Sequence, residues 1–251
     1  MFKLLHEGGE YLKGRGPEFA AWRKKNKRDK MFLPFERALG ARQDLKFDGC
    51  LPLFWNRNII LEFVRGFIDC KKSAGILDKS VYTRLRSNSF TALLRINVLW
   101  KYAFSEPFRW LAGKTSTLKG WSLWKMGWAL ELVEKAMNEI VADPSRIFAA
   151  DLDIFAPVAA ELPEFADWRA EERARKVKAE NGTQYVLWQE VLKEARTPAP
   201  GSGNAQATEL TLRLAKEMAQ KALDKMHCPK VALADKLESQ VHRNSTVSRV
   251  Q

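Results

Sequence analysis

The chain has 251 residues, of which 46% are hydrophobic and 11% aromatic, so it can form a sizeable core and is not disordered as a whole. Its formal net charge of +12 belongs to the first half. Residues 1–130 carry 25 Lys and Arg against 11 Asp and Glu, whereas residues 131–251 carry 17 against 19. The first half is therefore strongly basic, which is typical of proteins that bind polyanions.

The cysteines and the apolar runs indicate the compartment. Three cysteines are too few for a disulfide framework, so we expect a reducing intracellular compartment, the cytoplasm or the nucleus. The first residues include Glu7 and Glu10 and no long apolar run, which argues against a secretory signal. Every stretch of about 18 residues contains a charge, so no transmembrane helix is expected.

Residues 1–30 are predicted to form a basic N-terminal arm or helix. Pro17 suits the first turn of a helix. A strongly basic run follows, consisting of Arg23, Lys24, Lys25, Lys27, Arg28 and Lys30. Such a run is typical of a localisation signal or a nucleic-acid-binding arm, and equally of a solvated helix face.

Residues 31–196 are predicted to form a helical core domain. The three-to-four spacing of apolar residues predicts one helix from Asn58 to Gly75, and Ser89 suits the cap of a second. Arg95 and Lys101 fall off the apolar stripe of that second helix, so we expect both to face solvent or ligand. Glu106-Pro107 is expected to restart the chain.

The segment Ser122 to Val141 is predicted to be a helix that is buried on two sides and ends at Asp143-Pro144. Two apolar stripes support this, consisting of Met126, Leu130, Val133, Met137 and Ile140, and of Trp121, Trp124, Trp128 and Leu132. A further helix is expected from Pro163 to Glu180. Residues 184–194 fit either a helix or a strand through 185–188.

The end of the chain is predicted to be a linker, a helix and a tail. Residues 197–207 are rich in Pro, Gly, Ser and Ala and predict a flexible linker. Residues 208–226 predict an amphipathic helix suited to self-association or to a protein partner, and residues 242–251 a disordered tail within the unit 208–251. The predicted fold class is therefore all-α, a mainly helical single domain with a flexibly linked C-terminal helix.

The strongest functional signal is a window of basic and aromatic residues. Residues 79–130 hold one acid, Glu106, and five of the nine tryptophans. The candidate nucleic-acid-binding residues there are Lys79, Arg84, Arg86, Arg95, Lys101, Arg109, Trp110, Lys114, Lys119 and Lys125. Lys and Arg contact phosphates, and an exposed aromatic ring stacks on a base. We expect Trp110 to be that ring because it stands beside Arg109 in a short turn, and Trp100 and Trp128 to belong to the core.

Catalytic and metal signals are weak. His227 and Cys228 have no second pair at the spacing of a zinc site, and Gly113-Lys114-Thr115 lacks the upstream glycine of a phosphate loop. Asp151 and Asp153 are the best enzyme lead, since two nearby carboxylates can share a divalent metal. We expect no metal, no cofactor and no enzymatic activity.

Three functions therefore compete. The first is sequence-independent binding of nucleic acid, RNA rather than DNA, by a nucleocapsid-type protein or a ribonucleoprotein subunit. The second is a structural subunit of a large complex that binds acidic protein or lipid surfaces without nucleic acid. The third is a metal-dependent enzyme that uses Asp151 and Asp153.

Overall fold

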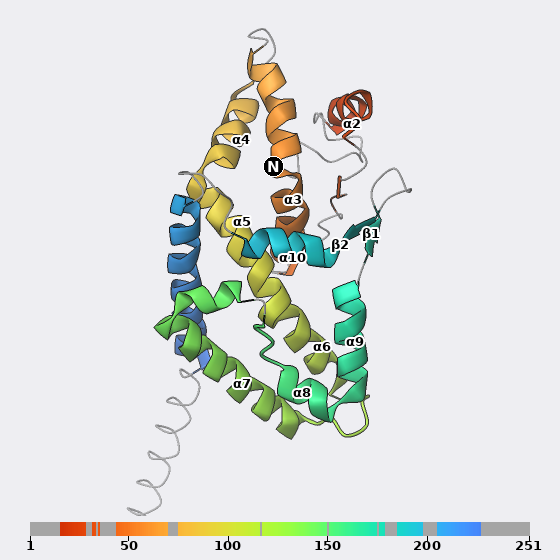
Figure 1. Cartoon of the computed structure of the whole chain (residues 1–251), viewed down its shortest axis with the longest axis vertical. Coiled ribbons are helices and arrows are strands. Elements are labelled where there is room, and N and C mark those ends of the chain that lie inside the picture. The colour runs from red at the N-terminus through yellow and green to blue at the C-terminus, as the bar shows by residue number, and fades with distance from the viewer. Residues whose placement is uncertain are drawn as a thin grey trace, which may run out of the picture.

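A computed structural model describes residues 16–28, 32–33, 35, 44–69, 75–115, 117–149, 151–174, 176–178, 185–197 and 205–226. Within these ranges the fold is all-α with one short two-stranded sheet, which confirms the predicted fold class. Helices gather around a central rod that crosses the molecule obliquely and consists of α5, η2 and α6 (Figure 1). The N-terminal residues 1–15, the linker residues 198–204 and the predicted tail lie outside the described ranges.

The first helices are α2 (Gly16–Lys25), α3 (Asp44–Asp69) and α4 (Ile76–Arg86). Pro17 stands in the first turn of α2, as predicted. Helix α3 begins well before Asn58 and continues through Pro52. It ends before Gly75, which instead precedes α4 and donates its N–H to Asp78 Oδ2 at 2.9 Å.

Helix α4 was absent from the expected elements because its buried side is short. Only Asp78, Val81 and Leu85 of this helix are buried, and these do not make an apolar stripe. Contacts with α3 hold it in place instead. The Nε atom of Arg57 in α3 donates to Leu85 O at 2.7 Å near the end of α4.

The central rod consists of α5 (Asn88–Trp100), the π-helical turn η2 (Lys101–Ser105) and α6 (Glu106–Lys114). A break was expected at Glu106-Pro107, yet the helix continues. The Glu106 N–H donates to Lys101 O, five residues back, as in a π-helix. Pro107 then occupies the first turn of α6 and has no N–H to donate, so Tyr102 O, five residues before it, accepts from Arg169 Nη1 at 3.5 Å instead.

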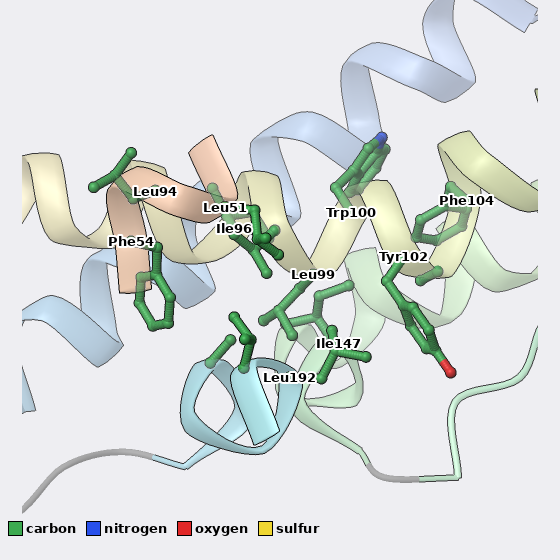
Figure 2. Close-up of a cluster of buried hydrophobic side chains, with 14 of the residues drawn as sticks. Leu51, Phe54, Leu94, Ile96, Leu99, Trp100, Tyr102, Phe104, Ile147 and Leu192 are labelled. Carbon is green, nitrogen blue, oxygen red and sulfur yellow. The ribbon is translucent and has the colours of Figure 1, made fainter. Parts of the chain in front are cut away.

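The core surrounds this rod. Figure 2 shows side chains from α3, the rod, the 3₁₀ turn η3 (Pro144–Phe148) and α10 (Trp188–Arg196) meeting in one cluster. Its labelled members include Leu51, Phe54, Leu94, Ile96, Leu99, Trp100, Tyr102, Phe104, Ile147 and Leu192. The expectation that Trp100 belongs to the core is confirmed.

Helix α7 (Leu123–Ala142) has the predicted ends but not the predicted environment. Ser122 directly precedes its first residue, and Asp143 follows its last residue, before Pro144. The first stripe is buried except for Leu130, which is 41% exposed. The second stripe includes Trp124, which is 92% exposed, so α7 is not buried on two sides. It lies at the edge of the molecule (Figure 1).

A short hairpin replaces the end of a predicted helix. After α8 (Ala156–Glu161), helix α9 (Pro163–Ala174) begins at the predicted proline but ends before residue 180. Strand β1 (Lys176–Lys178) then pairs antiparallel with β2 (Tyr185–Leu187), and Val177 lies opposite Val186. Residues 184–194 thus contain both expected alternatives, because α10 starts directly after β2.

A last helix covers residues 205–226, close to the predicted range. Its buried residues recur every four positions, at Ala207, Thr211, Ala215, Ala219 and Leu223. Its start is bonded to α5, since Asn88 Nδ2 donates to Gln206 Oε1 at 2.9 Å. The buried face thus packs against the helix's own chain, and docking of a partner on this helix stays a prediction. No helix among the described residues combines the length and the apolar character that a membrane crossing requires.

Asn56 in α3 joins two parts of the core. Its Oδ1 accepts from Leu33 N at 3.1 Å, and its Nδ2 donates to Leu33 O at 2.6 Å, in a fully buried position. We predict that Asn56→Ala lowers the free energy of unfolding by about 1–3 kcal/mol, because a buried backbone donor and acceptor lose their partner. Urea denaturation measures this.

The control for this prediction is Asn138→Ala. Asn138 is also on a helix, but it is exposed and its side chain bonds only to Glu134 O, at 3.0 Å. The gain in helix propensity is the same for both substitutions. Equal effects of the two would contradict the role of the Leu33 bonds.

Candidate nucleic-acid interface

The structure divides the candidate basic residues into a buried group and an exposed group. Arg23, Arg95 and Lys101 are buried, with exposed fractions of 2%, 4% and 6%. The other described candidates reach the surface wholly or in part. The buried members therefore serve the fold, and the exposed members make up any interface.

Arg95 was expected to face solvent or ligand, and this expectation is wrong. One of its guanidinium nitrogens donates to Thr208 Oγ1 at 3.1 Å and another to Thr197 O at 3.3 Å. Burial lowers the pKa of Arg95, and the nearby Glu194 carboxylate acts in the opposite direction. Arg95 thus joins α5 to the residues on both sides of the predicted linker.

Lys101 is also buried, contrary to expectation. Its Nζ lies 2.9 Å from Glu106 Oε1, and the Glu106 side chain is only 13% exposed. The π-turn explains this pair, because side chains five residues apart approach one face when the helix takes more residues per turn. The single acid of the window 79–130 is thereby neutralised inside the protein.

Trp110 does not stand in a short turn, and its ring is not free for stacking. It belongs to α6, with ring centroids 5.5 Å from Trp168 and 5.4 Å from Phe165 of α9. Lys114 Nζ lies 5.8 Å from the Trp110 ring centroid, which is within cation–π range. Trp110 therefore joins α6 to α9.

The basic run of the N-terminal segment is likewise divided. The Arg23 guanidinium lies between two rings, 3.6 Å from the Phe32 centroid and 4.8 Å from that of Phe19. Lys24, Lys25 and Lys27 are exposed, and Arg28 pairs with Glu62 at 3.0 Å. Lys30 lies outside the described residues.

The first exposed cluster, the α4 surface, consists of Ile76, Leu77, Lys79, Arg84 and Arg86. All five side chains are exposed, and Ile76 reaches 91%. The only acid of this helix, Asp78, is buried and accepts the Gly75 N–H. The outer face of α4 is therefore basic and partly apolar, with no exposed carboxylate of its own.

The second cluster, the α6–α7 surface, consists of Arg109, Lys114, Lys119 and Trp124. Arg109 lies 4.0 Å from the shielded Glu106 carboxylate. Lys125 lies beside this cluster and pairs with Glu161 at 3.6 Å. This surface and the α4 surface lie toward opposite ends of the molecule (Figure 1).

Among the described residues, no carboxylate lies within ion-pair distance of Lys79, Arg84, Arg86, Lys114 or Lys119. From the sequence, these bases were identified as candidate nucleic-acid-binding residues, but Trp124 was not included among them. Trp124 belongs to a predicted apolar stripe and was therefore expected to be buried, although it lies just after the loop between α6 and α7.

The two members of the candidate metal pair form separate ion pairs. Asp153 Oδ1 lies 3.2 Å from the buried Arg169, whereas Asp151 is exposed and lies 3.9 Å from Arg146. Over the described ranges no group of three His, Cys, Asp or Glu side chains could hold a metal ion. His227 and Cys228 lie outside those ranges, and the absence of enzymatic activity stays a prediction.

Comparison with known proteins gives no family. The chain matches no family model, and no similar curated protein or solved structure was found. Any functional conclusion therefore depends on the exposed residues themselves.

The thiol of Cys50 in α3 is close enough to Lys101 for its pKa to respond to that ammonium, so its reactivity is a measure of burial in this region. Burial raises the pKa of the Cys50 thiol from 9.0 to about 11, and the Lys101 ammonium opposes this shift. The neutral thiol is favoured in the native state, so its contribution to stability is complete below pH 9.0 and is lost as pH rises through about 11.

We predict that iodoacetamide labels Cys50 much more slowly in the native protein than in urea at pH values below 9.0. The thiolate fraction falls by about a hundredfold for a shift of about two pKa units. Peptide mass spectrometry at the Cys50 site measures the two rates. Equal rates in the native and the unfolded protein would contradict this burial.

Proposed function

We propose that this protein binds nucleic acid, RNA rather than DNA, without sequence specificity, through the α4 surface and the α6–α7 surface. The observation that carries the proposal is the buried pair Lys101–Glu106. It removes the only acid of the window 79–130 from the surface and leaves exposed bases beside it. Phosphate backbones are the polyanions that such bases contact.

The role proposed for such binding is a nucleocapsid-type protein or a ribonucleoprotein subunit in the cytoplasm or nucleus. The α4 surface precedes the central rod and the α6–α7 surface follows it, and the two lie toward opposite ends of the molecule (Figure 1), so they can contact separate stretches of one strand. Phosphate contacts dominate affinity for such partners and carry no sequence information. The exposed bases of α2, Lys24, Lys25 and Lys27, add to the same field.

We predict that the triple variant Lys79→Gln, Arg84→Gln and Arg86→Gln weakens RNA binding and its dependence on salt. For single strands each lost phosphate contact lowers the slope of log affinity against log salt by about 0.7, so three contacts lower it by about 2. Fluorescence anisotropy over a salt series with a labelled oligonucleotide measures the slope.

The matched control is Lys216→Gln, Lys221→Gln and Lys225→Gln, on the helix 205–226. These lysines are also exposed, and the variant has the same net charge. It should leave the slope nearly unchanged. Binding by the native protein that is independent of salt, or equal losses in both variants, would refute the α4 surface as a phosphate-binding surface.

One observation favours the second candidate function, a structural subunit that binds an acidic protein or lipid surface. Ile76 and Leu77 are 91% and 53% exposed, and aliphatic side chains contribute nothing to binding phosphates. Exposed apolar residues beside bases are typical of an anchor for an acidic partner.

The double variant Ile76→Ser and Leu77→Ser distinguishes the two candidate functions. If the α4 surface binds RNA, we predict that this variant retains RNA affinity within about twofold, because no charge is lost. Anisotropy with the same oligonucleotide measures this. Loss of a co-purifying protein or of binding to anionic vesicles, in the absence of RNA binding by the native chain, would support the second function.

A further inference from the structure

Trp124 is exposed to an extent that the fold does not require. Its side chain is 92% exposed at the start of α7, whereas Trp100 and Trp121 are buried. Trp110, Trp128 and others are partly buried against the core. An indole offers the largest apolar burial of any side chain, so a fully exposed one contributes almost nothing to stability. Its exposed faces remain free to contact a ligand.

The described residues just before Trp124 are hydrogen-bonded to α6 and to one another. Trp121 is buried, and its Nε1 donates to Leu111 O at 3.1 Å. The backbone N–H of Trp121 donates to Leu118 O at 3.1 Å, and that of Leu118 to Lys114 O at 3.0 Å. Gly120, with φ of 82°, provides the left-handed turn that this path needs. These bonds tie the residues before Trp124 to the end of α6.

The charge around Trp124 is of one sign along the chain. Residues 107–130 contain four bases and no acid. Of these bases, Lys114 and Lys119 are exposed and precede Trp124, one at the end of α6 and one in the connecting loop. Lys125, directly after Trp124, pairs with Glu161 at 3.6 Å, so Lys114 and Lys119 are the bases near Trp124 in sequence that no described carboxylate offsets.

A ligand for this arrangement needs a flat aromatic face and an anionic group on the same unit. An unpaired nucleotide has both, with a base for the indole and a phosphate for Lys114 or Lys119. In a duplex the base faces are already stacked on each other and cannot reach an external ring. A single-stranded region is therefore the form of nucleic acid that fits.

We propose that Trp124 stacks on an unpaired base of single-stranded RNA, and that Lys114 and Lys119 contact the neighbouring phosphates. This inference rests on the proposed function and narrows it from nucleic acid in general to single strands. It also replaces Trp110, whose ring packs on α9, as the stacking residue.

The test compares Trp124→Ala, Trp124→Phe and the control Leu130→Ala in the full chain. Leu130 is an apolar residue of the same helix and is 41% exposed. The probes are a labelled oligouridine of about 12 nucleotides, within the usual site size, and an RNA duplex of similar length. Circular dichroism verifies that each variant is folded.

Trp124→Ala should weaken binding of oligouridine by about tenfold and change duplex binding by less than about twofold, since stacking is lost and no charge is removed. Trp124→Phe, which keeps an aromatic face, should retain most of the affinity, and Leu130→Ala all of it. The slope against salt should be the same in all four proteins. Oligouridine should also quench the tryptophan emission of the native protein, and Trp124→Phe should remove that quenching.

Three results would overturn the inference. Trp124→Ala could bind oligouridine normally, or it could weaken the single strand and the duplex equally. It could also lose binding to phosphatidylserine vesicles while RNA binding is unaffected, which would assign the ring to lipid. Failure of the proposed function looks different, because the native protein would then bind neither nucleic-acid probe in a salt-dependent way.

Discussion

The fold depends on the π-turn at η2, because it determines where the rod goes and which charges leave the surface. An α-helix through Pro107 would lack a hydrogen bond and would place the ring of this proline against the preceding turn. The wider turn, in which Glu106 N–H reaches Lys101 O, carries the helix through this point, and Arg169 donates to Tyr102 O in place of the N–H that Pro107 lacks. α5 and α6 then act as one rod, and the core cluster of Figure 2 assembles along it.

The basic residues fall into two groups, those that are buried and paired within the fold and those that are exposed at the surface. Lys101 and Glu106 neutralise each other in the interior, and Arg95 bonds to residues on both sides of the linker. Burying a charge is costly unless it is paired or hydrogen-bonded, and each of these groups has such partners. The number of basic residues in the sequence is therefore larger than the number that is exposed at the surface. Among the described residues of the window 79–130, the bases that remain outside lie on α4 and from α6 to the start of α7.

Local signals predicted the parts of the fold that depend on neighbours in sequence. Ser122, Pro144 and Pro163 mark helix ends that the structure confirms, because caps and prolines act within one turn. Trp124 and Arg95 were misplaced because a periodic stripe shows which residues share a face, but not whether another element covers that face. Lys101 was misplaced for the same reason, since its N–H bonds to Asn97 O as in an α-helix and the side chains that cover it, Glu106 among them, lie outside the stripe.

In the helix 205–226, the spacing of the buried residues bears on what determines the position of the helix along its axis. Its buried positions Ala207, Thr211, Ala215 and Ala219 are all small and stand four residues apart, and the Thr211 hydroxyl is satisfied within the helix by Ala207 O at 2.6 Å. A slide of this helix by four residues, about 6 Å along its axis, would again place small side chains along most of this seam, and Leu223 is the one large buried member that it would displace. The small positions therefore do not define the axial register. Leu223 and the polar contacts at the start of the helix do, where Gln206 meets Asn88 and Thr208 meets Arg95.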